Sequence, residues 1–563
     1  MSEPALCCTP ARLDWSQPGG PRASDFGDVY FSVEDGLEET RSVFLKACGL
    51  PEAWKNQPVF TVGELGFGTG LNALGLWQLW REHGNRDGWL HLVSIEKHPL
   101  TRADAERALS AWPQLETLSR QLLTQWPSLF KGPHRLVFAE DRFSITVFQD
   151  EAEAALAQMG IAADVWFLDG FAPAKNEAMW SQTVLDHIGR LSRQGARIGT
   201  FTVAGAVRRG LAAAGFEVSK QPGFGRKRER LEAVYAGAGA GRERHEAPVV
   251  IYGAGIAGAS LAYALRKRGR AVRLIDPDGI AGGASSAPAG LLTPRLEKAD
   301  RPHVRATLAA FDYACRLYSP LAAFRQSGVT RLAKDEKEAT RLAALADLMG
   351  EGYRFDGEAL EMERAGWFDP VNIVRALIGE VRVDCEGRAE AGEVIIHANG
   401  PHFSLEGDIT PSAGRVGVFG GVAPERPLSW GGYLAPVPGG DVLMGATHIN
   451  GWEAGEDMDA MRGFHSALLK LRPELAEEIE AEPKSSWAGV RASTPDRLPV
   501  AGRLDNGDYV LSGLGSRGFA HAPLLAEQIA SQICGEALPL EHAGAQAFKP
   551  QRFAERRARR VQS

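Results

Sequence analysis

The sequence predicts an α/β protein with an N-terminal doubly wound domain and a C-terminal Rossmann-like domain that carries an inserted mixed α+β domain. Three observations predict this fold class. Glycine-rich loops at 64–70 and 253–258 each follow an apolar strand pattern and open a helix pattern. Strand and helix patterns alternate through the first 235 residues, which is typical of a parallel, doubly wound sheet. From residue 304 onward, long helical stretches alternate irregularly with short β-like runs.

The bulk composition is that of a globular protein with several domains. At ~150 residues per domain, 563 residues correspond to three or four domains. The hydrophobic and charged fractions, 44% and 24%, are ordinary for such proteins. No run of about 18 uninterrupted apolar residues occurs, so we expect no membrane span. The first 14 residues lack the basic and apolar regions of a secretory signal.

Cysteine usage indicates a reducing compartment. The six cysteines are scattered, and none of them forms a C-x-x-C pair. A reduced, cytoplasmic chain is the simplest interpretation, and we expect no metal site.

A candidate boundary lies between the two glycine loops. Residues 236–248 read Ala-Gly-Ala-Gly-Ala-Gly-Arg-Glu-Arg-His-Glu-Ala-Pro, small at first and then charged, with no periodic apolar pattern. This composition predicts a flexible linker. The predicted domains are therefore 1–235 and 249–563, with one glycine loop in each.

The first glycine loop follows the first of four strand patterns, at 59–65, 90–96, 135–139 and 164–169. In an open α/β sheet, ligands bind beyond the carboxyl ends of the strands. The residues there form a predicted cofactor site: Glu64, Gly66, Gly68, Gly70, Glu96 and Asp141. Glycines let the backbone pass close to a ligand, and the Glu96 carboxylate can accept hydrogen bonds from two ribose hydroxyls. The alternative is a structural glycine turn before a helix.

The spacing of this loop distinguishes it from a dinucleotide site. Glu64-x-Gly66-x-Gly68-x-Gly70 is not the G-x-G-x-x-G fingerprint. It resembles motif I of class I S-adenosylmethionine-dependent methyltransferases, and Glu96 matches the ribose-binding acid of that family. The resemblance implies S-adenosylmethionine as the cofactor.

The fourth strand pattern ends at Asp169, the predicted catalytic residue of this domain. Phe171 and Pro173 form a stiff apolar wall after it, and Lys175 follows as a candidate contact to the substrate. If the methyl acceptor is a primary amine, its pKa is near ~10.4, and methylation needs the neutral lone pair. A carboxylate can orient the amine and share its proton. Asp169 could equally be a solvated carboxylate at a strand end.

The second loop matches the dinucleotide fingerprint in full context. Gly253-x-Gly255-x-x-Gly258 follows a strand pattern and opens the helix pattern 259–267. A second strand then ends at Asp276, which suits a ribose hydroxyl. The pyrophosphate would lie at the helix N-terminus, where free N–H groups and the dipole favour negative charge.

Downstream residues favour FAD over NAD. Three segments carry the pattern: 282–292, which contains Ser285; 394–400, which ends at Gly400; and 511–518, which contains Gly513, Gly515 and Gly518. This pattern resembles the glycine oxidase and D-amino-acid oxidase family, whose members oxidise a carbon–nitrogen bond with FAD.

Two arginines are candidates for binding a substrate carboxylate in this second site. They are Arg491 and Arg517, because a guanidinium suits bidentate binding of a carboxylate. Either arginine could instead pair with a structural acid such as Asp496.

Basic residues form local clusters although the net charge is −7. Arg226, Lys227 and Arg228 are adjacent, and further arginines lie at 208–209 and in the C-terminal tail. Any one cluster is most simply a solvated helix face. Together they make a polyanion-binding surface more plausible.

The chain as a whole resembles the MnmC family of bifunctional tRNA-modification proteins, from about Leu13 to Pro550. The tracts that carry the resemblance are Phe26–Ser32, Glu64–Asn72, Phe167–Asn176, Gly223–Arg230, Gly253–Gly258, Gly489–Gly502 and Gly513–Pro523. The resemblance implies two steps on the wobble uridine in the tRNA anticodon loop. The FAD domain would remove a carboxymethyl group from an amine, and the methyltransferase domain would methylate the primary amine that remains.

Two other interpretations remain open from the sequence. One is a small-molecule amine oxidase, of the glycine or sarcosine type, fused to an amine methyltransferase. The other is a tRNA-binding flavoprotein scaffold that has lost one activity.

Overall fold

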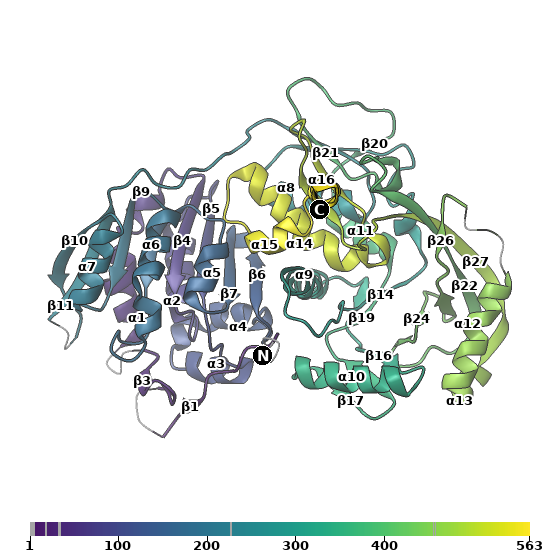
Figure 1. Ribbon diagram of the computed structural model, residues 1–563, viewed down its shortest axis with the longest axis horizontal. Coiled ribbons are helices and arrows are strands. Elements are labelled where there is room, and N and C mark those ends of the chain that lie inside the picture. The colour runs from purple at the N-terminus through teal and green to yellow at the C-terminus, as the bar shows by residue number, and fades with distance from the viewer. Residues whose placement is uncertain are drawn as a thin grey trace. The chain divides into compact units, whose positions relative to one another are not determined.

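The computed structural model describes residues 6–16, 20–31, 35–225, 228–453, 455 and 458–562, and the chain forms two compact units (Figure 1). The N-terminal unit comprises Cys7–His245 and Ser531–Ala543. The C-terminal unit comprises Glu246–Ala530 and the residues from Gly544 onward, together with Leu6 among the described residues at the start of the chain. Within the described ranges, no helix is long and apolar enough to cross a membrane.

The N-terminal unit contains an eight-stranded sheet in the order β10-β11-β9-β8-β4-β5-β7-β6. Its strands are β4 (Val59–Leu65), β5 (Trp89–Ile95), β6 (Gly132–Phe138), β7 (Phe143–Gln149), β8 (Ala163–Leu168), β9 (Ser192–Thr200), β10 (Phe216–Pro222) and β11 (Glu229–Tyr235). The five strands β4, β5, β7, β8 and β9 are parallel, whereas β6 pairs antiparallel with β7, and β11 pairs antiparallel with β9 and β10.

Helices cover both faces of this sheet, as expected for a doubly wound fold. One face packs against α1 (Gly36–Glu39), a π-helix (Thr40–Lys46), α2 (Leu71–His83), α3 (Arg102–Leu109) and α4 (Glu116–Thr124). The other packs against α5 (Ala152–Gln158), α6 (Gln182–Leu191) and α7 (Gly205–Ala213). Alternate residues of a strand face opposite sides, so Val62 of β4 lies in the first core and Leu65 in the second. The predicted fold class is confirmed for this unit.

The C-terminal unit contains the predicted Rossmann-like sheet, in the order β20-β13-β12-β21-β29-β28. Its strands are β12 (Val249–Tyr252), β13 (Val272–Ile275), β20 (Val383–Asp384), β21 (Val394–His397), β28 (Val500–Arg503) and β29 (Tyr509–Ser512). All neighbours pair in parallel except β28 and β29. The helices α8 (Ile256–Lys267) and α11 (Pro370–Ile378) pack against each other, and α14 (Gly518–Cys534) follows β29.

A mixed sheet interrupts this Rossmann-like fold, as predicted. Its order is β17-β18-β16-β23-β24-β25-β22-β26, with β27 paired to β22. The strands are β16 (Val329–Leu332), β17 (Tyr353–Phe355), β18 (Ala359–Met362), β22 (Thr410–Gly421), β23 (Leu428–Ser429), β24 (Tyr433–Pro436), β25 (Val442–Gly445), β26 (Ile449–Asn450) and β27 (Ile479–Ser493). One face packs against α12 (Met458–Leu471) and α13 (Pro473–Glu477). Further helices of the unit are α9 (Pro302–Tyr318), α10 (Glu336–Met349) and α16 (Arg552–Gln562).

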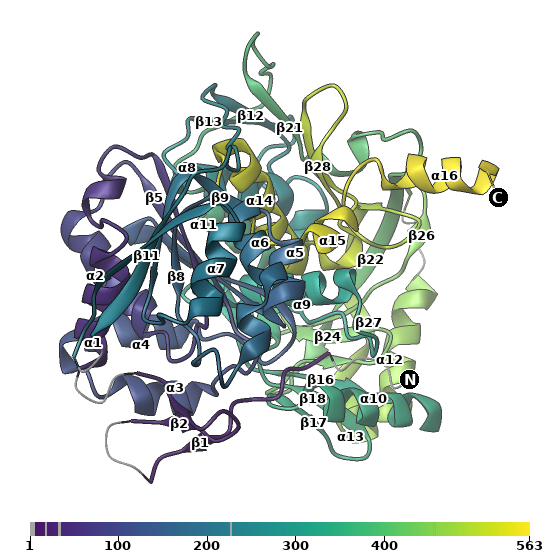
Figure 2. The same cartoon turned by 60° about the vertical axis from the view of Figure 1, so that its left-hand side comes forward.

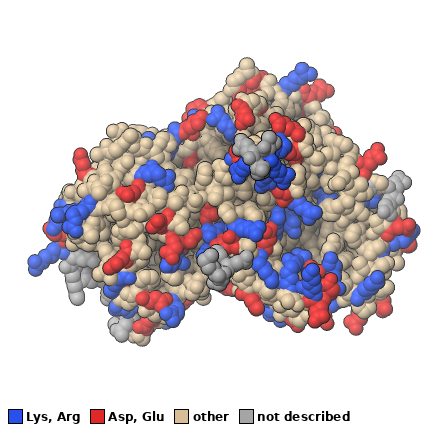
Figure 3. Space-filling view, in the orientation of Figure 1, with Lys and Arg blue, Asp and Glu red and all other residues tan. Residues whose placement is uncertain are grey.

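The basic C-terminal helix α16 extends from the unit in Figure 2 and is held at its base by acids. Arg552 and Arg556 both pair with Asp496, at 3.0 and 2.7 Å. Arg557 pairs with Asp408 and Glu406, at 2.6 and 3.0 Å. Figure 3 likewise shows Lys and Arg interspersed with Asp and Glu over the face it presents. Arg552, Arg556 and Arg557 are therefore ion-paired with acids of the same unit.

The stretch predicted as a flexible linker is packed where it carries Arg242. This guanidinium donates to the carbonyl oxygens of Val59 and Ala162, at 2.8 and 2.6 Å, and to Thr61 Oγ1 at 2.9 Å. It also pairs with Asp164 at 2.6 Å, with only 14% of the arginine side chain exposed. Residues 236–245 are thereby part of the N-terminal unit.

Substituting Arg242 by alanine should destabilise the N-terminal unit. Two buried carbonyl groups and Thr61 would lose their donor, and an unsatisfied buried polar group costs about 1–3 kcal/mol. We expect the free energy of unfolding to fall by about 2 kcal/mol, measured by chemical denaturation. Arg193 contacts the same Asp164 at 2.6 Å but is more exposed, so Arg193→Ala is a matched control with a smaller effect. Equal losses in both variants would contradict this explanation.

Candidate functional site

The N-terminal unit has a cavity of 320 Å³ at the carboxyl ends of β4, β5 and β8. Its lining includes five of the predicted positions or their neighbours: Gly66, Gly68, Glu96, Asp169 and Phe171. The first tract of the chain contributes Phe26, Asp28, Tyr30 and Phe31 to the same lining. A cofactor loop, a carboxylate and an aromatic wall therefore meet in one place.

The glycines of the first loop are required by its backbone. Gly66, Gly68 and Gly70 all have positive φ, at 86°, 52° and 80°, a region that side chains other than glycine rarely adopt. A Cβ on Gly66 would lie 2.3 Å from the Asp169 carbonyl oxygen. Gly70 is the N-cap residue of α2 and does not line the cavity.

Glu96 holds the loops around this cavity together. One carboxylate oxygen accepts from the Gly68 N–H and the other from the His98 N–H, each at 2.9 Å. Burial raises the pKa of this carboxyl group, and the backbone N–H groups oppose that shift. The position fits the ribose end of S-adenosylmethionine, with the glycine loop beside it.

Glu64 lies beneath the loop and not in the cavity lining. Its side chain is fully buried, next to Ser94, Asn72 and Asp169. Burial raises the pKa of Glu64 to about 8. Burial therefore favours the protonated form of the Glu64 carboxyl group near neutral pH.

The structure does not bring Asp141 to the cavity. The strand pattern at 135–139 is β6, which turns at 139–141 into the antiparallel neighbour β7. Asp141 therefore lies at the amino ends of the parallel strands, where it accepts from Trp77 and Arg81, both at 2.8 Å. The residue that follows the third parallel strand is Asp150, after β7. The apolar run 143–149 ending in an acid was the signal that could have identified it.

An aromatic wall closes the cavity on the side of the first tract. The Phe26 and Phe171 rings lie 4.7 Å apart, and Tyr30 meets Phe171 edge-on at 5.4 Å. Asp28 fixes the two segments, because it accepts from the Ala172 N–H at 3.1 Å. Lys175, predicted to contact substrate, pairs with Asp28 at 3.3 Å and donates to the Gly27 carbonyl at 2.7 Å.

Sequence reasoning missed two residues that support Asp169. Asn72 donates to the Asp169 carboxylate at 2.8 Å, and Thr40 donates to the Asn72 amide oxygen at 2.7 Å. All three residues line the cavity.

The predicted basic cluster at 226–228 is described only in part. Arg226 and Lys227 lie outside the described residues, and Arg228 is exposed directly before β11. The structure therefore places Arg228 at the surface, away from the cavity lining.

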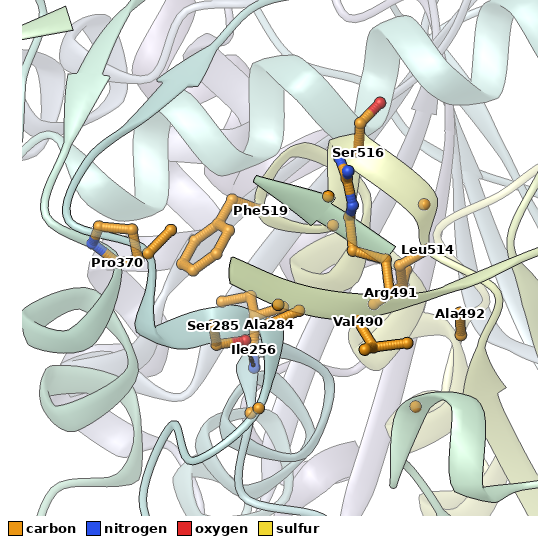
Figure 4. A pocket seen from close by; sticks show the side chains of 18 of the residues that line it. Ile256, Ala284, Ser285, Pro370, Val490, Arg491, Ala492, Leu514, Ser516 and Phe519 are labelled. Atoms are coloured by element: carbon orange, nitrogen blue, oxygen red, sulfur yellow. Dashed lines mark hydrogen bonds between the residues drawn. The ribbon is translucent and has the colours of Figure 1, made fainter. Parts of the chain in front are cut away.

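The C-terminal unit has a larger cavity, of 880 Å³, between the Rossmann-like sheet and the mixed sheet. Most predicted cofactor positions line it: Gly253, Gly255, Asp276, Ser285, Gly400, Gly513, Gly515 and Gly518. Figure 4 shows Ser285, Arg491 and Phe519 around this cavity, each from a different segment. Gly258 is not in the lining; a Cβ there would lie 1.8 Å from the Gly253 carbonyl oxygen, so its role is close packing of helix on strand.

The glycine loop 253–258 and the first turn of α8 form a site that fits a dinucleotide. Asp276 accepts from the Ala254 N–H at 2.7 Å, and the Ser285 hydroxyl accepts from the Ile256 N–H at 3.0 Å in the first turn of the helix. A Cβ on Gly253 would lie 2.4 Å from the Ala398 carbonyl oxygen, so the 398–400 loop lies directly against the glycine loop. Cβ atoms on Gly283, Gly400 and Gly515 would enter open space. These residues fit the binding of FAD.

Three arginines, Arg331, Arg491 and Arg517, line this cavity. Arg331 was not singled out from the sequence, and it is paired with Glu338 at 2.9 Å. Burial lowers the pKa of the Arg517 guanidinium, and the nearby Arg295 and Arg331 lower it further. Burial, followed by Arg517 and Arg295, also lowers the pKa of His521 to about 3, so this histidine is neutral. Such a group of cations suits an anionic ligand.

Asp496 is not the partner of either candidate arginine. Although burial raises its pKa, the ion pairs with Arg552 and Arg556 lower it to about 2. Arg491 on β27 instead donates to the Thr447 carbonyl oxygen at 3.1 Å. Both predicted arginines therefore face the cavity without this acid.

The two units are of known classes. Residues 113–236 match the model of the S-adenosyl-L-methionine-dependent methyltransferase family, and residues 248–382 and 369–532 match that of the FAD-dependent oxidoreductases. The chain is thus a methyltransferase joined to an FAD-dependent oxidoreductase, and the implied cofactors are S-adenosylmethionine and FAD.

Relatives over the whole length define the family more closely. The chain is 56% identical to the tRNA 5-methylaminomethyl-2-thiouridine biosynthesis bifunctional protein MnmC of Maricaulis maris, over 100% of this chain and 99% of the relative. It is 41% identical to the MnmC protein of Caulobacter sp. strain K31, over 99% of each. Among solved structures it is similar to glycine oxidase from Geobacillus kaustophilus, at 21% identity and a TM-score of 0.44, over 51% of this chain and 95% of that one. The chain belongs to the MnmC family.

The protonation of Glu64 can be tested by Glu64→Gln. With a folded pKa of about 8 against 4.5 in the unfolded chain, the folded state retains a proton that the unfolded state loses. Wild-type stability from this group is therefore full below pH 4.5 and is lost as the pH rises to about 8.

Glutamine has the shape of protonated glutamic acid and does not ionise. We expect the melting temperature of the N-terminal unit to fall less in Glu64→Gln than in the wild type between pH 5 and pH 8. Scanning calorimetry at several pH values measures this difference. A variant that is less stable than the wild type at pH 8 would show that the ionised carboxylate is the stabilising form.

Proposed function

We propose that the chain modifies the wobble uridine of tRNA in two successive steps. The C-terminal unit oxidatively removes the carboxymethyl group of 5-carboxymethylaminomethyl-2-thiouridine and leaves the 5-aminomethyl form. The N-terminal unit then methylates this amine to give 5-methylaminomethyl-2-thiouridine. The names of the full-length relatives support the product and the tRNA substrate. A tRNA substrate and six cysteines without disulfides favour the cytoplasm as the place of action.

The observation that carries the order of the steps is the charge of the two cavities. Arg331, Arg491 and Arg517 line the oxidoreductase cavity, which suits a substrate that bears a carboxylate. Carboxyl groups of Asp28, Glu96 and Asp169 line the methyltransferase cavity. That site suits a positively charged primary amine. Removal of the carboxymethyl group converts the first kind of ligand into the second.

In the oxidoreductase cavity, the chain binds and orients the substrate. Gly253, Gly255 and the first turn of α8 would hold the FAD pyrophosphate, and Asp276 would hold a ribose. When bound, FAD supplies the two-electron acceptor for oxidation of a carbon next to nitrogen. Arg491 and Arg517 would bind the carboxylate and so fix which carbon–nitrogen bond is presented.

In the methyltransferase cavity, the chain deprotonates and orients the amine. Gly66, Gly68 and Glu96 would hold S-adenosylmethionine, which supplies an electrophilic methyl group when bound. An alkyl amine with a pKa near ~10.4 enters this site as an ammonium ion. Asp169 would accept a hydrogen bond from it and then its proton, which leaves the nitrogen lone pair to form the new N–C bond.

RNA contacts complete the proposal. A single base in an anticodon loop can be splayed out and held against aromatic or cationic side chains, as Phe26 and Phe171 at the methyltransferase cavity could do. Phosphate contacts supply affinity without sequence information. We assign this role to Arg226, Lys227 and Arg228, with Lys175 at the cavity margin.

Replacing Asp169 should separate cofactor binding from catalysis. Asp169→Asn keeps the size of the side chain and removes the proton acceptor, and Asp169→Ala removes the whole group. We expect S-adenosylmethionine binding to remain within about twofold, and methyl transfer to fall by about 10²–10⁴-fold. Calorimetry and transfer of a labelled methyl group to 5-aminomethyl tRNA measure the two effects. Unimpaired turnover in both variants would remove Asp169 from the mechanism.

Replacing Arg491 should weaken binding of the carboxylated substrate. A hydrogen bond to a charged group contributes about 1.5–3 kcal/mol, so Arg491→Ala should raise the KM for carboxymethylaminomethyl tRNA by about 10–100-fold. Arg491→Lys keeps the charge but loses the bidentate geometry, so its KM should lie between those of the wild type and Arg491→Ala. Anaerobic bleaching of the flavin by tRNA measures this, with free glycine and sarcosine as parallel substrates. Unchanged kinetics would exclude the role, and bleaching by the free amines alone would favour a small-molecule oxidase.

A further inference from the structure

Three segments that are far apart in the sequence meet at the Asp169 carboxylate. Asp169 follows β8, Asn72 is in the first turn of α2 directly after the glycine loop, and Thr40 begins the π-helix. The Asn72 side-chain N–H donates to Asp169 Oδ2 at 2.8 Å. The Thr40 hydroxyl has two acceptors within reach: Asn72 Oδ1, to which it donates at 2.7 Å, and the more distant Gly36 carbonyl oxygen at 3.1 Å. The chain of hydrogen bonds runs from Thr40 through Asn72 to Asp169.

The Thr40 hydroxyl and the Asp169 carboxylate are matched to opposite ends of the Asn72 amide. The two ends of an amide are similar in shape, and one is a donor while the other is an acceptor. An ionised carboxylate only accepts, so the amide must present its N–H group to Asp169. Its oxygen then faces Thr40 and needs a donor, which the hydroxyl supplies. Without that hydroxyl, the amide oxygen loses this donor, and the Asn72 side chain is held by its contact with Asp169 at one end only.

Thr40 and Asn72 are largely buried, although both line the cavity. Thr40 is 2% exposed and Asn72 is 8% exposed. A Cβ on Gly75 of α2 would lie 2.9 Å from the Thr40 methyl carbon, so the helix backbone approaches the threonine closely. Thr40 therefore contributes two separable features: a methyl group that fills space and a hydroxyl that orients the amide.

We propose that Thr40 and Asn72 are positioning residues for methyl transfer, which hold the Asp169 carboxylate in the orientation that receives the amine. This inference rests on the function proposed for the N-terminal cavity. It assigns to the helix around Thr40 a part in catalysis in addition to its packing in the core.

Two variants at Thr40 separate the two features. Thr40→Val keeps the shape and removes the donor, and Thr40→Ser keeps the donor and removes the methyl group. We expect Thr40→Val to lower kcat for methylation of 5-aminomethyl tRNA by about tenfold or more, with KM and the Kd for S-adenosylmethionine within about twofold. Thr40→Ser should retain most of the wild-type kcat, even if its melting temperature is lower than that of Thr40→Val. Asn72→Asp, of the same shape, should lose at least as much activity as Thr40→Val.

Thr307→Val is the matched control. Thr307 is buried in α9 of the other unit, and its hydroxyl donates within its own helix to the Val304 carbonyl oxygen at 3.0 Å. The same substitution there should leave methyl transfer unchanged.

Three outcomes would contradict different parts of the proposal. The opposite order of activity, with Thr40→Ser worse than Thr40→Val, would assign Thr40 a packing role only and overturn the inference. A rise in the Kd for S-adenosylmethionine that matches the loss of rate would assign the pair to cofactor binding, and would overturn it as well. If the wild-type chain itself does not methylate 5-aminomethyl tRNA, the proposed function fails first and this inference fails with it.

Discussion

The close approach of two neighbouring strand ends determines the layout of both units. In the N-terminal unit, a Cβ on Gly66 would lie 2.3 Å from the carbonyl oxygen of Asp169, at the end of the adjacent strand. In the C-terminal unit, a Cβ on Gly253 would lie 2.4 Å from the carbonyl oxygen of Ala398, again at the end of an adjacent strand. Only glycine permits this approach. It places the loop that would hold the cofactor directly beside the segment that completes each site.

The chemistry of each site depends on what that neighbouring strand end carries. Asp169 brings a carboxylate to the first cavity, and Asn72 and Thr40 hold it there. In the second cavity, the 398–400 loop adds to the cradle, and the mixed sheet supplies the arginines on β16 and β27. The two sites therefore differ in charge as the substrate and product of an oxidative removal of a carboxymethyl group would differ. This complementarity gives a physical reason for both activities to occur in one chain.

Local patterns predicted much of this organisation. Glycine spacing, the acid at the end of the second strand and the C-terminal glycine segment depend on short stretches of sequence, and they indicated the fold class and both cofactors. Asp141 was misplaced because an apolar run does not reveal whether its strand is parallel or antiparallel to its neighbours. Only the pairing of β6 with β7 shows that β6 is antiparallel, so that Asp141 lies at the opposite edge of the sheet. Thr40 and Asn72 could not be linked to Asp169 from sequence, since they lie 129 and 97 positions from it and meet only in the folded unit. The arginines of α16 appeared as a basic cluster because their acidic partners, Asp408 and Asp496, are distant in the sequence.

The most direct test of the central claim is nucleoside mass spectrometry of tRNA that carries 5-carboxymethylaminomethyl-2-thiouridine, after incubation with the full chain and FAD. Without S-adenosylmethionine, the account predicts accumulation of the 5-aminomethyl nucleoside. With S-adenosylmethionine, it predicts the 5-methylaminomethyl nucleoside in its place. Failure of the primary amine to appear without the methyl donor, or methylation of a nucleoside that still carries the carboxymethyl group, would contradict the account.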